Sequence, residues 1–488
     1  MASEYLRSVL TVAALTGGLA ACSPFSDTPP PATSIGLPES PQNFAVRAED
    51  EPGLVDDNWV ASFDDQKLNA LVSEAMTNNL SLKGTAAKVR EAEARARRAG
   101  AELSPEVDLS GSGGRGGPLQ DTATGSFDLG LQASWELDVW NRLGNEAQAA
   151  TLDAIAARAD YRGARLSLAG QVATSWFVLL GDARQVELDE RNLQTQLQAY
   201  NVVDARVETG LVMPLDRNVA QADVARAREQ LAQSKGAFDD AARSLEIVLG
   251  RYPSAEIEAA KKLTEVPPPT PAGLPSELLE RRPDIVAADR RVAAAYNRTA
   301  AAKAARLPQF SLTANIGGTS QNLKDVLDPI NIAWNFAGNI FMPVFDGGRL
   351  ETEAEISTAL QEEALASYAD LALNAFGEVE TALANEGVLR TQEEQLKITV
   401  QQLSEAENIT MARYREGQVN YLDVNQVRQE RISAEKQHLG LQVERLKQRV
   451  QLHLVLGGSF KEDEPPASDL PKPGMDSEKS GEPAAPAA

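Results

Sequence analysis

The feature that most limits how this 488-residue chain can fold is an internal duplication. Ala205-Arg206 in the first half recurs 207 residues later as Ala412-Arg413, and the same offset relates Val248-Leu249-Gly250 to Val455-Leu456-Gly457. A repeat of this length is a duplicated folding unit rather than the short period of a solenoid. The fold must therefore be built from two similar halves.

Both halves contain a very long helical pattern. Each half begins with a helical segment, Gln66–Ala99 in the first and Asp284–Arg306 in the second, and two strand-like segments follow. The long pattern comes next, at Leu143–Glu208 and at Leu350–Glu416. At 1.5 Å per residue each would measure on the order of 100 Å. Apolar and small residues recur along both at intervals of three and four, which favours coiled-coil packing in a tube or rod over an ordinary bundle.

Four segments alternate apolar and polar residues. The clearest is Ser126–Leu137, and the others are Val107–Gly113, Phe310–Gly317 and Ile332–Phe336. Alternation over about ten residues is typical of transmembrane barrel strands, although a half-buried soluble sheet would show it too. Four strands cannot close a barrel, since single-chain barrels need about eight. The subunits must then share one, and we favour a trimer with twelve strands around a wet lumen over a dimer with eight.

The N-terminus predicts an exported lipoprotein. The apolar run from Val9 to Leu19 is too short to span a bilayer but suits a secretory signal. It ends in Leu19-Ala20-Ala21-Cys22, which contains the only cysteine of the chain and resembles a bacterial lipoprotein box. Cys22 would then be lipidated and become the mature N-terminus, and Ser23 favours the outer membrane by the same resemblance. A buried cysteine behind an ordinary signal peptide is the alternative.

Proline-rich segments and the duplication divide the chain into six parts. We expect a signal peptide over residues 1–21, a lipidated tether over 22–58, a first repeat over 59–251, a linker over 252–283, a second repeat over 284–458 and a disordered acidic tail over 459–488.

Composition excludes several classes of function. A formal net charge of −23 argues against nucleic acid as a partner. One cysteine and two histidines leave no material for a zinc site, a disulfide framework or a cysteine–histidine catalytic pair. Acidic pairs on helices occur by chance, and no nucleophile elbow or metal motif accompanies them. We therefore expect no enzyme, no cofactor and no metal site. A periplasmic coiled-coil scaffold or adaptor lipoprotein is the alternative, but it would not explain the four strands.

Motifs in both repeats resemble one family. The first repeat opens with Trp59-Val60-Ala61-Ser62-Phe63-Asp64, and the second with Leu278-Leu279-Glu280-Arg281-Arg282-Pro283-Asp284. Phe345-Asp346-Gly347-Gly348-Arg349 and Tyr421-Leu422-Asp423-Val424 follow later. These motifs resemble the TolC-like outer membrane factors, and within them the NodT/OprM-type efflux lipoprotein branch.

The resemblance implies both an architecture and a function. Members are homotrimers in which a twelve-stranded outer-membrane barrel stands on a long periplasmic α-helical barrel. They are the passive exit ducts of tripartite efflux pumps or of type I protein secretion. An inner-membrane transporter, here of the RND type, supplies the energy, and a periplasmic adaptor docks at the helical tips. The lipoprotein branch favours small molecules such as drugs over proteins as cargo.

Two glycine-containing breaks mark the predicted helical tips. Gly210-Leu211-Val212 and Gly417-Gln418-Val419 interrupt the two long helical patterns, and glycine lets the chain reverse between antiparallel helices. The adaptor-contact turns of the family match these positions. The resemblance therefore assigns adaptor contacts to Gly210, Leu211, Gly417 and Val419.

The resemblance also implies a gate near the tips. Asp423 matches an aspartate that lines the periplasmic aperture, and three copies would form an acidic ring with raised pKa values that selects cations. The plainer alternative is that this aspartate is the N-cap of its helix. Tyr414 and Asp216 match a pair that ties the hairpins together in the closed state of some relatives. Some members carry a further acid where this chain has Gln426, so the ring would be less acidic here.

Overall fold

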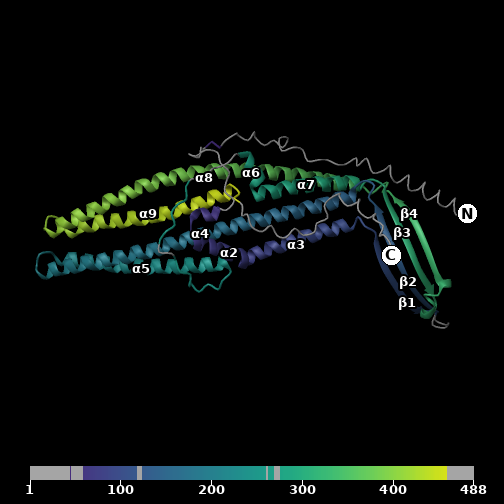
Figure 1. The fold of residues 1–488 in the computed structure, drawn as a ribbon, viewed down its shortest axis with the longest axis horizontal. Helices are drawn as coiled ribbons and strands as arrows, with labels where there is room; N and C mark the ends of the chain where they lie inside the picture. The colour runs from purple at the N-terminus through teal and green to yellow at the C-terminus, as the bar shows by residue number, and fades with distance from the viewer. Residues whose placement is uncertain (1–43, 46–58, 118–123, 260–261, 269–274, 459–488) are drawn as a thin grey trace, which may run out of the picture.

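The computed structural model describes residues 44–45, 59–117, 124–259, 262–268 and 275–458. The predicted signal peptide, the tether with Cys22 and the C-terminal tail lie outside the described residues, apart from the two residues 44–45 of the tether. The molecule is long, with a sheet at one end and paired helices reaching away from it (Figure 1).

Each repeat has the same order of elements. The first contains α2 (Gln66–Asn78), α3 (Leu80–Ala101), β1 (Glu106–Gly116), β2 (Thr124–Leu137), α4 (Arg142–Glu208) and α5 (Pro214–Leu249). The second contains α6 (Pro275–Arg281), α7 (Pro283–Ala304), β3 (Gln309–Ser320), β4 (Ile332–Phe341), α8 (Arg349–Arg415) and α9 (Tyr421–Val455). The two long helices, α4 and α8, have 67 residues each. The predicted strands and long helices are thereby confirmed.

The four described strands form one antiparallel sheet in the order β1-β2-β3-β4. Leu131 of β2 pairs with Leu109 of β1 and with Ile316 of β3, which in turn pairs with Trp334 of β4. Paired residues share a face, so the register places most of the large apolar side chains of the four strands on one side of the sheet. On the other side Asp128 accepts hydrogen bonds from the hydroxyls of Ser112 (3.1 Å) and Thr319 (2.8 Å).

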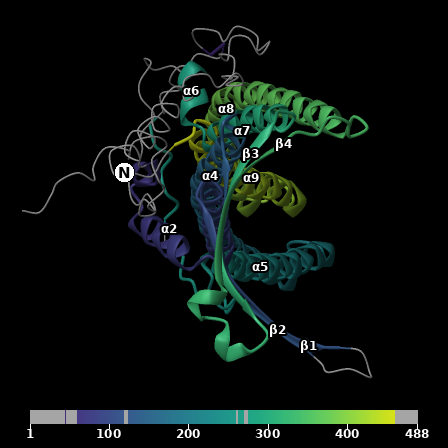
Figure 2. The same cartoon turned by 90° about the vertical axis from the view of Figure 1, so that its right-hand side faces the viewer.

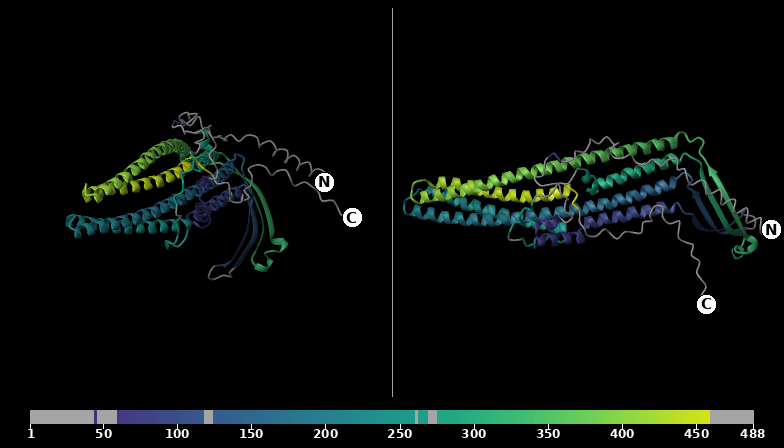
Figure 3. Two further views of the ribbon diagram at one scale, coloured as in Figure 1. Left: turned by 60° about the vertical axis from the view of Figure 1, so that its left-hand side comes forward. Right: turned by 45° about the horizontal axis from the view of Figure 1, so that its top comes forward.

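The helices beside the sheet follow the order of the strands. α3 leads into β1, β2 into α4, α7 into β3 and β4 into α8. α4 packs between α3 and α7 (Figure 1), and α8 packs on the other side of α7 (Figure 2). Farther from the sheet, α5 pairs with α4 and α9 with α8, and these two hairpins run side by side (Figure 3). No helix in the described ranges is long and apolar enough to cross a membrane.

The core confirms the predicted coiled-coil seams. Ala169, Ala173 and Trp176 of α4 are buried, as are Ala372 and Val379 of α8. Alanine at such positions lets neighbouring helix backbones approach closely, which suits a thin wall of helices more than a thick globular core.

One predicted helix is wrong. Gln66–Ala99 is not a single helix, because the chain turns at Asn79 between α2 and α3, where ψ is 125°. The Asn79 side chain accepts a hydrogen bond from the Leu82 N–H and donates one to the Val248 carbonyl (2.8 Å). Asparagine is a strong N-cap, and here it starts a new helix while joining that helix to the end of α5.

Candidate functional site at the hairpin tips

Both hairpins reverse through the same turn. At the first tip (residues 209–216) Gly210 has φ 70°, and its N–H donates to the Val207 carbonyl while the Leu211 N–H donates to Arg206 (2.9 Å). At the second tip (residues 416–423) Gly417 has φ 78°, and the Gln418 N–H donates to Arg413 (2.9 Å). This pair of bonds is a Schellman motif, which ends a helix and requires a left-handed residue. The two glycines therefore have the turn-forming place that the sequence predicts.

The helices that leave the tips begin differently. Asn420 is the N-cap of α9: its side chain accepts from the Asp423 N–H (2.9 Å), and the Asp423 carboxylate accepts from the Asn420 N–H (3.1 Å). This is a capping box. The suggestion that Asp423 is itself the N-cap is thus wrong by three residues. At the start of α5, Met213 is the N-cap without a side-chain hydrogen bond, and Pro214 follows it.

The predicted contact residues differ in exposure. Leu211 is 69% and Met213 67% exposed at the first tip, whereas Val419 at the second is partly buried against the cluster that holds Tyr414. Asp423 is exposed, and so is Gln426, whose amide nitrogen lies 3.3 Å from a Glu430 carboxylate oxygen. The second tip thus partly buries Val419 and, among its apolar residues, exposes only Leu422 (49%), whereas Leu211, Met213 and Leu215 are all exposed at the first tip.

Tyr414 is a buried residue between the two hairpins. The Arg206 guanidinium of α4 lies 4.7 Å from the Tyr414 ring centre and donates to the Tyr414 carbonyl (2.8 Å). Burial raises the pKa of Tyr414; the Arg206 charge opposes this rise, and the nearby Asp216 carboxylate adds to it. Within the described residues the Tyr414 hydroxyl has no hydrogen-bond partner, so the predicted Tyr414–Asp216 pair is close but not hydrogen bonded.

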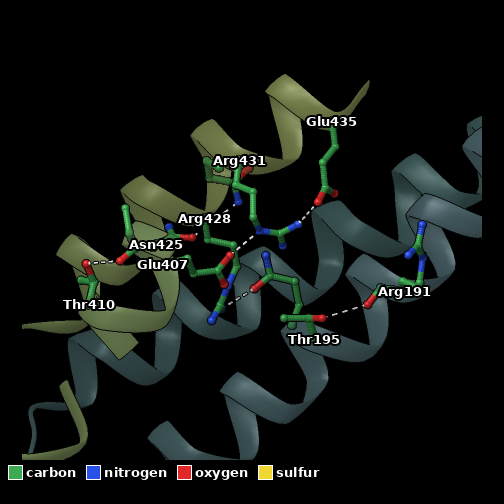
Figure 4. A network of polar contacts seen from close by, with 11 residues as sticks. Arg191, Thr195, Glu407, Thr410, Asn425, Arg428, Arg431 and Glu435 are labelled. Atoms are coloured by element: carbon green, nitrogen blue, oxygen red, sulfur yellow. Dashed lines mark hydrogen bonds and ion pairs between the residues drawn. The ribbon is translucent and has the colours of Figure 1, made fainter. Parts of the chain in front are cut away.

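Above the tips, a buried arginine links the two hairpins. Arg428 of α9 is 1% exposed, and its Nε donates to a Glu407 oxygen of α8 (2.7 Å). Its Nη1 lies 3.3 Å from the Gln196 amide oxygen of α4, in the other hairpin. Arg431 donates to the second Glu407 oxygen and also to Glu435 (Figure 4). Sequence reasoning missed this network because its partners on α4 and α9 are 232 residues apart.

The network extends to the fourth helix through Asp223 of α5. Asp223 is 2% exposed and pairs with Arg226 of the same helix (3.1 Å). Burial raises its pKa, and the charges of Arg226 and of Arg428 on α9 oppose this rise. Burial first, and then the Asp223 charge, raise the pKa of Tyr421 to about 12. For Glu407, burial opposes ionisation, but hydrogen bonds from Arg428 and Arg431 hold the pKa below its ordinary value. Buried charges of both signs thus fix the four helices against each other near the tips.

The fold and the tips define a class of protein: a subunit that contributes a sheet with one apolar face to a wall and long helices to a tube. Comparison with known proteins then gives the family. A family model described as outer membrane efflux protein matches residues 71–251 and 274–458, and the chain belongs to this family.

Individual relatives agree along nearly the whole chain. The cation efflux system protein CusC of Escherichia coli (strain K12) is 32% identical over 91% of this chain and 97% of its own length. The pyoverdine export outer membrane protein OpmQ of Pseudomonas putida is 32% identical over 92% and 97%. Among solved structures, the outer-membrane channel OprN has a TM-score of 0.81 at 25% identity, covering 90% of this chain and 99% of its own. The CusC structure has a TM-score of 0.79 at 29% identity over 90% and 100%.

These comparisons confirm the predicted family, fold class and role. The similar structures are trimeric channels with a β-barrel and a helical barrel, and the family consists of transporters. The chain is therefore an outer-membrane efflux channel, the exit duct of an efflux system. A scaffold or adaptor would have neither this sheet nor these relatives.

Proposed function

We propose that three copies of this chain form the exit duct of a tripartite pump that is driven by an inner-membrane transporter of the RND type. A periplasmic adaptor joins the two, and small molecules such as drugs pass through the duct without energy supplied by this component. The observation that carries the proposal is the open four-stranded sheet with one predominantly apolar face. Such a sheet is stable in a membrane only when copies close it into a barrel.

The first test is the detergent-corrected mass of the protein extracted from the outer-membrane fraction, measured by light scattering. We expect about three chains per particle, and ion currents when the particle is placed in a planar bilayer. A monomer, or a protein released without detergent, would overturn the proposal.

We also propose that Cys22 carries the lipid that anchors the mature chain to the outer membrane. The support is the Leu19-Ala20-Ala21-Cys22 sequence behind a signal-like apolar run. Cys22→Ala should abolish incorporation of labelled palmitate. The trimer should survive, because barrel closure holds the subunits together.

The adaptor docks at the hairpin tips in this proposal. Gly210 and Leu211 form the first contact, and Gly417 and Val419 form the second. Exposed apolar side chains at the first tip support the assignment, because exposed apolar surface marks sites of protein–protein interaction. The two repeats act as the units 59–251 and 284–458, with the linker 252–283 between them. Leu211→Asp should reduce adaptor crosslinking in cells, whereas an unchanged yield would remove the first tip from the contact.

Asp423, together with Asp216, Tyr414 and Gln426, forms the gate in this proposal. Because Asp423 also closes a capping box, alanine would remove the charge and the cap together. Asp423→Asn keeps an oxygen for the Asn420 N–H and removes only the charge. We expect weaker cation selectivity in Asp423→Asn and a smaller change in Asp216→Asn. Unchanged reversal potentials in both would leave Asp423 with its capping role alone.

A further inference from the structure

The two outer helices of the protomer beside the sheet carry exposed faces with a seven-residue pattern. On α3 this face consists of Leu80, Gly84, Ala87, Glu91, Ala94, Arg98 and Ala101, all of them exposed. On α8 it consists of Thr352, Ile356, Ala359, Glu363, Ala366, Asp370 and Leu373, also all exposed. We call these the α3 face and the α8 face. Leu80 is 76% and Leu373 47% exposed, so each face contains apolar surface that nothing in the described chain covers.

The duplication supplies a template for what covers them. α3 corresponds to α7 with an offset of 203 residues, and α4 corresponds to α8 with an offset of 207. The positions equivalent to the two exposed faces are the ones through which α4 and α7 pack inside the protomer. Ala149 and Leu152 contact Ala294 there, and Ala156 and Ala159 contact Ala287.

The order of the elements points to the same neighbour. β1 and β4 are the edges of the described sheet, and α3 and α8 lie directly beside them in the helical layer. When β4 of one subunit pairs with β1 of the next, as β2 pairs with β3 inside the chain, α8 is brought against α3 of that next subunit. Each subunit boundary would then repeat the contact that joins the two halves of one chain.

The charges of the two helices are complementary. α3 has an excess of basic residues: Lys83, Lys88, Arg90, Arg95, Arg97 and Arg98, against Glu91 and Glu93. The part of α8 beside the sheet, residues 349–373, has an excess of acidic residues: Glu351, Glu353, Glu355, Glu362, Glu363 and Asp370, against Arg349. Two copies of either helix would repel each other, whereas one of each attracts. The charge therefore favours the α3–α8 pairing over α3–α3 or α8–α8.

The template also identifies which charges meet. Arg90 is equivalent to Ala293 and Glu362 to Ile155, and these two apolar residues pack on the same cluster in the protomer. Arg97 and Glu355 lie one heptad farther along their helices, on the same flank of the antiparallel seam. All four charged residues are exposed, and none has an ion pair with another described residue. Residues that flank the seam of an antiparallel coiled coil form interhelical ion pairs.

We propose that the α8 face of one subunit docks on the α3 face of the next, with Arg90 paired to Glu362 and Arg97 to Glu355 across the boundary. The partner of this surface is a second copy of the same chain. The proposal rests on the trimer proposed above and adds the residues that orient one subunit against another.

Charge reversal tests the pairing. Arg90→Glu with Arg97→Glu, or Glu355→Arg with Glu362→Arg, places like charges at all three boundaries. In a graded series of SDS concentrations, each double variant should show at least a fivefold larger fraction of monomer than the unmodified protein at the same concentration. The variant that carries all four changes should recover most of the trimer. Glu430→Lys with Glu444→Lys alters exposed acids of α9, which lies between α4 and α8, and should leave the trimer unchanged.

A cysteine pair tests the geometry without relying on charge. Gly84 and Ala366 are equivalent to Ala287 and Ala159, which share a cluster. Gly84→Cys with Ala366→Cys should give disulfide-linked dimers and trimers on oxidation, whereas Gly84→Cys with Ala364→Cys, which turns toward the core of its own subunit, should give only monomers on a denaturing gel. Equal stability of all charge variants, or absence of crosslinks in a particle of trimeric mass, would overturn this boundary and leave the trimer intact. A wild-type particle that is not a trimer would instead overturn the proposed function.

Discussion

The two hairpin tips share one turn but differ in how the next helix begins. Gly210 and Gly417 end their helices through the same pair of hydrogen bonds, and both have open space around the Cα. The helix after Gly417 then starts with a capping box, whereas the helix after Gly210 starts with Met213 and Pro214 and leaves apolar side chains exposed. The capping box of the second tip supplies side-chain acceptors for two backbone N–H groups. The first tip has more surface to gain by binding a partner.

Removal of the arginine that joins the hairpins should have the largest effect. Arg428→Met leaves the Gln196 amide without its partner and removes one of the two arginines that bind Glu407. Breaking a buried charged network costs about 3 kcal/mol. We expect faster amide hydrogen exchange at both tips and larger single-channel currents. The matched control is Gln221→Met, since the exposed Gln221 is the equivalent residue in the first repeat. Equal protection in both variants would show that the hairpins are held by apolar packing alone.

Replacement of either turn glycine should have equal, intermediate effects. A Cβ at Gly210 or at Gly417 meets no atom within 4 Å, so the cost comes only from the left-handed backbone. That cost is about 1 kcal/mol for alanine. Thermal unfolding of Gly210→Ala and Gly417→Ala should therefore shift by the same amount. Unequal shifts would mean that the two turns are not equivalent even though their hydrogen bonds match.

Substitutions at the helix N-caps should have different effects at the two tips, whereas the glycine substitutions should not. Asn420→Ala removes the capping box and should cost about 1 kcal/mol, measured as faster exchange in the first turn of α9. Met213→Asn gives α5 the cap that it lacks and should slow exchange there. Met213→Ala is the control and should change little. If Met213→Asn had no effect, Pro214 would already determine how that helix begins.

The smallest effect is expected from acid. The pKa of Glu407 is held below its ordinary value in the fold, so this group adds stability that is fully present above the ordinary glutamate pKa and is lost as pH falls through the lowered value. Unfolding midpoints followed by circular dichroism should fall below about pH 4. The fall should be smaller in Glu407→Gln. An identical pH profile in that variant would exclude Glu407 as a source of acid sensitivity.

The sequence predicts most of the fold because its signals can be read without knowing which distant residues are in contact. Alternation along Ser126–Leu137 and the spacing of alanines on α4 depend only on neighbouring residues, and the 207-residue offset is visible in the sequence itself. The break at Asn79 was missed, although an asparagine pair inside a helical pattern is a recognisable N-cap signal. The Arg428 network could not be predicted, because an arginine on one amphipathic helix gives no indication of which distant helix faces it.

The duplication has a consequence for anything that binds the end of the tube. A ring of three chains presents six hairpin tips. In three of them the following helix begins with a capping box, and in the other three it begins without a side-chain cap. Six identical subunits of a binding partner placed around such a ring would not find six identical binding sites. Alternate copies of an identical binding protein would therefore meet different surfaces, although all six tips come from a single kind of chain.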